Sequence, residues 1–421
     1  MSNKTAKLQI IGLFIAYIIL IVIYKDGDMS DFEDFQTRSI KLGYNFEEHF
    51  VETEDGFIIS IHRVRAKNNS ELETSQNFNN NETSINMETL QQLQKKNPIL
   101  MGHGLGGSSD TFNRNVEEKS LAYFLARSGY DIFIMNSRGN KYSYQHKIYS
   151  IEQSEYWDFS FQDMAKYDVP AVANYILNKI YNQQAQNQQQ TIEQNEQIKL
   201  NYIGHSQGCT IILAALSDKS VPSSYFENVV LMTPAALILH GTSPVSDFIQ
   251  KVDVLSFFQQ AGLHKFLQMN AFNYYLCRAI PYICEFSVGI TTDNFESPIN
   301  HDLFYKLMYH YPAGTSTKAY IHFNQLMKSK KFQKFDYGAE KNFAMYNSTQ
   351  VPEYALSNIN NKIHILAGTQ DIITPLEDIY YLKEQLVNAQ NVTITLFNEG
   401  HCSFIIGKEN EFLNFIPQIL V

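Results

Sequence analysis

The chain has few cysteines, and none of them lies in a metal-binding pattern. Its 421 residues include four cysteines, with no CxxC pair and no His/Cys cluster at ligand spacing. The common zinc motifs are therefore excluded. Cys277 and Cys284 are close enough in the chain to bridge in an oxidising compartment, and two free thiols fit the sequence equally well.

Positive charge is also scarce. The chain carries 33 Lys and Arg against 43 Asp and Glu, which gives a formal net charge of −10. Phosphate neutralisation needs clustered Lys and Arg, and no basic run with interleaved aromatics occurs, so we expect no nucleic-acid partner. The hydrophobic fraction of 44% is that of an ordinary globular protein, and the length suits one large α/β domain with insertions.

No apolar run is long enough to be an unambiguous membrane span. The run from Ile10 to Tyr24 falls between a signal h-region and a full span; Lys4 and Lys7 precede it, and no small-x-small cleavage site follows. We therefore interpret residues 1–29 as a signal peptide or, preferably, an uncleaved signal-anchor. A buried N-terminal helix is the alternative.

The charges around this segment place the rest of the chain in the lumen of the secretory pathway or outside the cell. A secreted or lysosomal location follows, with membrane tethering if the segment is not cleaved. N-x-S/T sequons agree with that side of the membrane and predict N-glycosylation at Asn68, Asn81, Asn347 and Asn391.

Strands and helices alternate along most of the chain. A hairpin and short apolar runs beside helix-compatible segments give eight expected strands: Phe46–Glu52, Phe57–Val64, Ile99–Met101, Asp131–Met135, Lys199–Ile203, Asn228–Thr233, Lys362–Ala367 and Val392–Phe397. Runs that are apolar on both faces are typical of buried parallel strands. This order predicts an α/β fold with a mostly parallel eight-stranded sheet and helices on both faces.

Three stretches interrupt the alternation. Residues 67–97 and 182–197 are rich in Asn and Gln and are expected to be exposed insertions. Residues 235–342 contain helical patterns at Val245–Gln260 and Phe323–Lys330 but no convincing strand. We interpret this third stretch, the cap segment, as a helical cap over the carboxyl ends of the strands, between core parts 30–234 and 343–421.

A nucleophile motif lies at one of these strand ends. Gly204-His205-Ser206-Gln207-Gly208 follows an expected strand and precedes an expected helix. A G-x-S-x-G sequence at such a junction makes a sharp turn that presents the serine hydroxyl, and side chains in place of Gly204 and Gly208 would collide with nearby backbone. Ser206 is therefore the expected nucleophile.

A serine hydroxyl needs a histidine base held by a carboxylate, and such a pair follows in the chain. Asp371 comes just after the strand at Lys362–Ala367, and His401 comes just after the strand at Val392–Phe397. Both belong to strand ends on the serine's edge of the sheet. The sequence predicts Ser206, Asp371 and His401 as a catalytic triad for acyl transfer.

Backbone N–H groups should bind the negative charge that develops on the substrate carbonyl oxygen. The N–H of Gln207 follows the nucleophile directly. His103-Gly104-Leu105-Gly106-Gly107 follows an earlier strand, and we assign the N–H of Leu105 as the second donor. A plain glycine turn is the alternative for that loop.

With these residues in place, the chain resembles the acid lipases, the α/β-hydrolase family of gastric and lysosomal acid lipase. Beyond the nucleophile turn, matching segments run from about Gly43 to Gly407. They include Glu54-Asp55-Gly56, His103-Gly104-Leu105, Asn136-Ser137-Arg138-Gly139-Asn140, Pro312-Ala313-Gly314-Thr315-Ser316 and Lys334-Phe335-Asp336-Tyr337-Gly338. Cys277 and Cys284 align with the family's cap cysteines, whereas the two Asn/Gln-rich insertions are foreign to it.

The resemblance implies hydrolysis of triacylglycerols or sterol esters at a membrane or emulsion surface, without metal, cofactor or obligate protein partner. It also implies Ser206, Asp371 and His401 as catalytic residues, and Leu105 and Gln207 as oxyanion donors. Two alternatives remain: a general carboxylesterase for small soluble esters, and a non-catalytic lipid-binding protein. An intact nucleophile, base and acid argue against the second.

Overall fold

The computed structural model describes residues 33–67, 96–182, 198–244, 254–266 and 280–420, together with Phe248 and Leu276. Several predictions fall outside these residues. They are the N-terminal segment 1–29, Asn68, Asn81, Cys277 and nearly all of the two Asn/Gln-rich insertions. Within the described parts of the chain, no helix is both long and apolar enough to span a bilayer.

The fold begins with a helix and an antiparallel hairpin. Helix α2 (Phe35–Lys41) leads into β1 (Asn45–Glu52), which pairs with β2 (Phe57–Arg65) over its whole length. Gly56 occupies the turn with φ +96°, a conformation that glycine adopts without a side-chain clash. The expected hairpin is confirmed, and it forms one edge of the central sheet.

The sheet contains nine strands, eight of which follow one path in the order β1-β2-β4-β3-β6-β7-β10-β11. All pairings from β4 to β11 are parallel. The bounds agree with the predicted strands to within two residues: β3 (Ile99–Gly102), β4 (Ile132–Met135), β6 (Leu200–His205), β7 (Phe226–Met232), β10 (Lys362–Gly368) and β11 (Asn391–Phe397). The ninth strand, β5 (Gln145–His146), pairs with β2 and was not predicted, because two polar residues carry no periodic signal.

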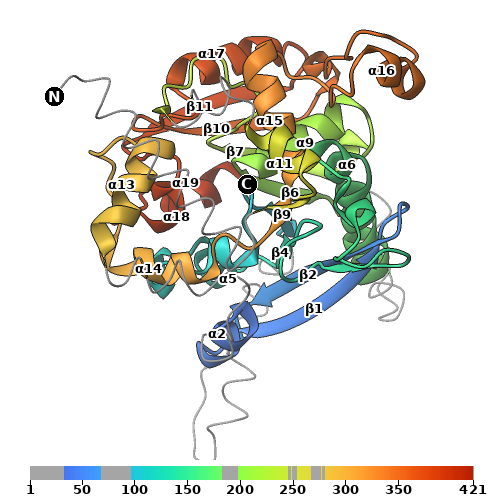
Figure 1. Ribbon diagram of the computed structural model, residues 1–421. Coiled ribbons are helices and arrows are strands. Elements are labelled where there is room, and N and C mark those ends of the chain that lie inside the picture. Colours follow the sequence, from blue (N-terminus) through green and yellow to red (C-terminus); the bar gives the residue numbers. More distant parts are fainter. Residues whose placement is uncertain are drawn as a thin grey trace, which may run out of the picture.

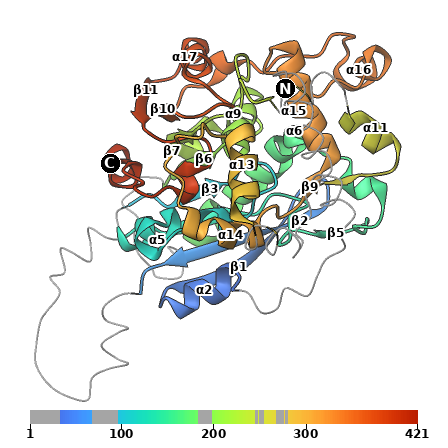
Figure 2. The same cartoon turned by 60° about the vertical axis from the view of Figure 1, so that its left-hand side comes forward.

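Two hydrophobic layers cover the faces of this sheet, as the apolar strand runs predicted. Along β6, Tyr202 packs into one layer and Ile203 into the other. The first layer includes α7 (Val169–Asn174), α9 (Gln207–Ser217) and α17 (Leu376–Gln385), and the second includes α5 (Leu121–Arg127) and α19 (Phe412–Ile419). Figures 1 and 2 show the twisted sheet at the centre of the molecule with helices packed around it.

The chain between β7 and β10 contains most of the remaining helices, drawn from green-yellow to orange in Figure 1. They are α11 (Val254–Gln260), α13 (Pro281–Thr291), α14 (His301–His310), α15 (Thr317–Ser329) and α16 (Ala339–Tyr346). No strand was expected here, but β8 (Lys265–Phe266) and β9 (Thr315–Ser316) form a small antiparallel pair. Each is only two residues long, so neither leaves an alternating pattern in the sequence.

Candidate active site

Ser206 lies on the predicted sharp turn between β6 and α9. Its φ of 53° and ψ of −115° are strained for a residue with a side chain. A Cβ at Gly204 would lie 2.7 Å from the backbone nitrogen of Cys209, and one at Gly208 only 2.1 Å from the carbonyl oxygen of Gly102. Only glycine fits at both positions, as the sequence indicated.

The structure brings the three predicted triad residues together. The Oγ of Ser206 lies 2.8 Å from Nε2 of His401, and Nδ1 of His401 lies 2.8 Å from Oδ2 of Asp371. His401 and Asp371 are 4% and 6% exposed, so their ion pair is shielded from water. The serine hydroxyl, the imidazole and the carboxylate form one continuous chain of hydrogen bonds.

Asp371 is fixed by its own loop, just beyond the end of β10. Its Oδ1 accepts hydrogen bonds from the backbone N–H groups of Ile373 and Thr374, at 2.8 and 2.9 Å, and its Oδ2 accepts one from the Thr374 hydroxyl at 2.7 Å. A carboxylate with this many donors is held in one orientation. The Oδ2 atom of Asp371 also faces Nδ1 of His401.

The environment of His401 adjusts its basicity. Burial lowers the pKa of its imidazole, but attraction to Asp371 and their hydrogen bond outweigh burial, so the net shift is upward. Next to it, burial lowers the pKa of His205 to about 3, and Nε2 of this neutral ring donates to the carbonyl of His401 at 2.9 Å. His401 is therefore the member of this pair that is suited to accept a proton near neutrality.

The two predicted oxyanion donors are free to bind a substrate oxygen. No group in the described residues accepts a hydrogen bond from the backbone N–H of Leu105 or of Gln207. Gln207 begins α9, where N–H groups and the helix dipole favour negative charge. Nearly all other buried backbone donors in proteins are paired, so two free ones beside Ser206 point to a binding role.

Residues of the cap segment hold the oxyanion loop, which we define as residues 103–107. The hydroxyl of Tyr311 donates to the carbonyl of Leu105 at 3.1 Å, and the N–H of Ala313 donates to the carbonyl of Gly106 at 2.7 Å. The N–H of Lys141 in turn donates to the carbonyl of Ala313 at 2.8 Å. The carbonyls of Leu105 and Gly106 are thus occupied while the N–H of Leu105 stays free.

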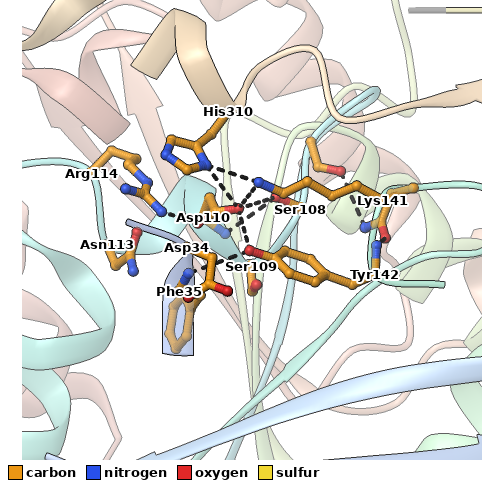
Figure 3. Close-up of polar contacts among 12 residues, drawn as sticks. Asp34, Phe35, Ser108, Ser109, Asp110, Asn113, Arg114, Lys141, Tyr142 and His310 are labelled. Carbon is orange, nitrogen blue, oxygen red and sulfur yellow. Dashed lines mark hydrogen bonds and ion pairs between the residues drawn. The ribbon is translucent and has the colours of Figure 1, made fainter. Parts of the chain in front are cut away.

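A buried charged cluster lies next to this loop, with Asp110 at its centre (Figure 3). Asp110 forms ion pairs with Arg114 and with Lys141, whose Nζ lies 2.6 Å from Oδ2, and it accepts a hydrogen bond from Tyr142 at 2.9 Å. His310, the last residue of α14, lies 2.8 Å from Nζ of Lys141. The cluster therefore ties the end of α14 to the chain that follows the oxyanion loop.

Both cations of the cluster, Arg114 and Lys141, face the buried Asp110 carboxylate. Burial would raise the pKa of the Asp110 carboxyl, but Arg114 and Lys141 hold it well below its usual range. Burial lowers the pKa of His310 to about 3, so its ring stays neutral and its Nδ1 accepts from Lys141. These residues were not predicted, because Lys141 and His310 lie far from Asp110 in the chain.

The remaining predicted residues fall at separate places. Cys284 is disulfide-bonded, whereas Cys209 and Cys402 are free thiols. Asn347 and Asn391 are both exposed, as a glycosylation acceptor must be. Two further buried carboxylates next to His401, those of Asp293 and Glu399, were missed, since single acids in irregular segments carry no signal in one sequence.

Two family models match the chain. Residues 35–116 match a partial alpha/beta-hydrolase lipase region, and residues 97–274 match the alpha/beta hydrolase fold. A solved structure, a soluble variant of monoglyceride lipase from Saccharomyces cerevisiae, aligns with a TM-score of 0.50 at 14% identity, covering 89% of this chain and 94% of that one. This likeness supports the fold.

Curated relatives match over most of both chains. Gastric triacylglycerol lipase of Rattus norvegicus is 31% identical, over 82% of this chain and 80% of its own length. Lysosomal acid lipase/cholesteryl ester hydrolase of Homo sapiens is 29% identical, over 87% and 85%. Lipase 1 of Drosophila melanogaster is 30% identical, over 83% and 70%.

Proposed function

Since this chain belongs to the acid lipase family of the α/β-hydrolase fold and is a carboxylic ester hydrolase, we propose that it cleaves neutral lipid esters with Ser206, His401 and Asp371. The observation that carries the proposal is the pair of 2.8 Å hydrogen bonds from Ser206 through His401 to Asp371. This geometry matches the requirements for an activated serine nucleophile.

The mechanism is acyl transfer. Ser206 attacks the ester carbonyl while His401 accepts its proton, and Asp371 orients the imidazole and stabilises its charged form. The N–H groups of Leu105 and Gln207 bind the oxyanion. His401 then protonates the leaving alcohol, and a water molecule activated by the same imidazole releases the fatty acid from Ser206.

The surface of the cap segment supports a lipid substrate. Exposed apolar side chains gather on and just after α13: Tyr282 is 80% exposed, Phe295 66%, Ile283 42% and Phe286 39%. Exposed apolar groups in such number mark a surface that meets an apolar partner. Relatives named for triacylglycerol and cholesteryl ester hydrolysis agree with this substrate class.

We also place the mature chain in the secretory pathway, secreted or lysosomal. Relatives named gastric and lysosomal lipases, the exposed sequons at Asn347 and Asn391, and the disulfide at Cys284 support this location. Membrane tethering depends on the N-terminal segment. We further propose that the cap segment, residues 235–342, gates access to Ser206.

The decisive assay is hydrolysis of emulsified long-chain triacylglycerol and cholesteryl ester between pH 4 and 8, compared with a soluble short-chain ester. Ser206→Ala should lower kcat by about 10⁴- to 10⁶-fold while the protein stays folded. Ser224→Ala, at an exposed serine, is the matched control and should retain full activity. Near-normal turnover by Ser206→Ala would contradict the triad, and cleavage of short-chain esters alone would make the protein a general esterase.

A further inference from the structure

A carboxylate of the cap segment binds the backbone of the loop that carries His401. Asp293 follows α13, and its side chain is fully buried. Its Oδ1 accepts a hydrogen bond from the N–H of Cys402 at 2.7 Å, and its Oδ2 accepts one from the N–H of Ser403 at 3.1 Å. These are the first two residues after His401, so both carboxylate oxygens hold the backbone of the base.

The fit between Asp293 and this loop leaves no spare room. A Cβ at Gly400 would lie only 2.3 Å from Oδ2 of Asp293. The Ser297 hydroxyl donates to the same Oδ2 at 2.9 Å and lies 2.9 Å from Oγ of Ser403, which accepts the Gly400 N–H at 2.6 Å. The residues on either side of His401 are thus fixed through one buried network.

The same short segment also contacts the loop of the catalytic acid. Residues 293 and 371 form an antiparallel bridge. The N–H of Asn294 donates to the carbonyl of Gln370 at 2.8 Å, and the N–H of Ile372 donates to the carbonyl of Thr292 at 3.2 Å. Residues 292–294 therefore join the loop of the acid to the loop of the base, although neither loop belongs to the cap segment.

We propose that Asp293 is a positioning residue of the reaction. Its carboxylate fixes the loop so that the imidazole of His401 stays within reach of both Ser206 and Asp371. It acts through the backbone rather than on the ester, and the inference rests on the proposed role of His401 as the base. Any displacement of residues 292–294 of the cap segment also releases the base from its productive position.

The substitution Asp293→Asn distinguishes a positioning role of the carboxylate from a role in packing alone. Asn has the same shape as Asp, but an NH₂ group replaces one of the carboxylate oxygens. This NH₂ group would face a backbone N–H, and two donors cannot form a hydrogen bond with each other. It also removes a negative charge near His401. The carboxylates that act on the His401 imidazole are Asp371 and Asp293, and removing Asp293 leaves Asp371 as the one that stabilises its charged form. The neutral His205 ring lies beside the imidazole, and Glu399 lies two residues before it in the same loop.

The test measures kcat, KM and the pH dependence of kcat/KM for Asp293→Asn on a soluble ester. We expect kcat to fall about 10- to 100-fold with KM unchanged, because the base is misplaced while the ester site is intact. The acidic limb of the pH profile of kcat/KM should move to lower pH, because the charged form of the His401 imidazole loses a nearby negative charge that stabilises it. Asp378→Asn is the matched control: it removes a carboxylate that is 1% exposed and accepts the N–H groups of Leu239 and His240.

We expect the control variant to keep the wild-type kcat and acidic limb, even if its melting temperature falls. A wild-type kcat and pH profile for folded Asp293→Asn would overturn the positioning role. Should that variant not fold, Ser297→Ala decides: it keeps the carboxylate but removes one of the two hydrogen bonds to Oδ2, and an unchanged kcat would overturn the inference. Near-normal turnover by His401→Ala would instead contradict the proposed function itself.

Discussion

The two sides of the site depend on buried groups of opposite character. On the side of the oxyanion loop, burial lowers the pKa of His103 to about 4, and its Nε2 accepts a hydrogen bond from the N–H of Ser137. On the side of the base, burial raises the pKa of Glu399 to about 7. Both sides are stable with these groups uncharged, but one must exclude a proton and the other must keep one.

This difference gives the two sides opposite responses to pH. A histidine whose folded pKa lies below its ordinary value contributes stability above about pH 6.5, and that contribution is lost as the pH falls toward 4. An acid with a raised folded pKa contributes stability below about pH 4.5, which is lost as the pH rises through 7. Mild acid therefore stabilises the base side and weakens the oxyanion side.

The largest expected effect is on chemistry, at the base side. Asp371→Asn keeps the shape of the acid but no longer holds His401 in the tautomer and charge state that proton transfer needs. We expect kcat to fall by about 10⁴-fold. The folded state should change far less, because Asn still accepts from the backbone N–H groups of Ile373 and Thr374.

Ester hydrolysis and thermal melting of the same preparation check this prediction. A loss of activity in proportion to a loss of folded protein would show that Asp371 serves only the fold. Retention of kcat would point to another acid as the partner of His401.

The next effect is on stability, at the oxyanion side. Asp110→Asn would leave Arg114 and Lys141 facing each other with no opposing charge in a buried cluster (Figure 3). Removing one partner of a buried ion pair lowers the free energy of unfolding by about 3–5 kcal/mol. Denaturant unfolding measures this loss.

Glu52→Gln is the matched control for this loss. Glu52 pairs with Lys147 at 2.6 Å, and the two side chains are 48% and 57% exposed. A pair in contact with water contributes only about 0–1 kcal/mol. Equal losses for the two variants would contradict the claim that burial makes the Asp110 cluster sensitive.

The strand ends that carry the chemistry could be predicted from the sequence. Ser206 and Asp371 each follow a buried parallel strand that leaves an apolar run, and His401 follows the partly exposed edge strand β11. The carboxyl ends of these parallel strands share one edge of the sheet. The glycines on both sides of Ser206 indicated that neighbouring backbone packs closely against this turn, and the structure shows these contacts directly. These features are local, so one sequence suffices.

The groups that hold these loops could not be predicted. Asp110, Lys141 and His310 meet only because α14 returns to the oxyanion loop, and their pairing depends on tertiary contacts. Asp293 lies in an irregular turn after α13, where nothing in the neighbouring residues distinguishes it from a surface acid. These residues have their roles because they are buried. An irregular segment that is buried shows no periodic pattern of apolar residues, so its burial cannot be predicted from the sequence.

The smallest expected effect isolates the pH response of the base side. Glu399 is 4% exposed, and because of its raised pKa we expect its own contribution to the free energy of unfolding to fall by about 2–3 kcal/mol between pH 4.5 and pH 7. Glu399→Gln mimics the protonated side chain at every pH, so we expect this fall to disappear. The loss of stability below pH 6.5 should remain, because His103 is unchanged. Denaturant unfolding at half-unit pH intervals measures both limbs, and an identical pH profile for the variant would show that the carboxyl of Glu399 does not titrate in this range.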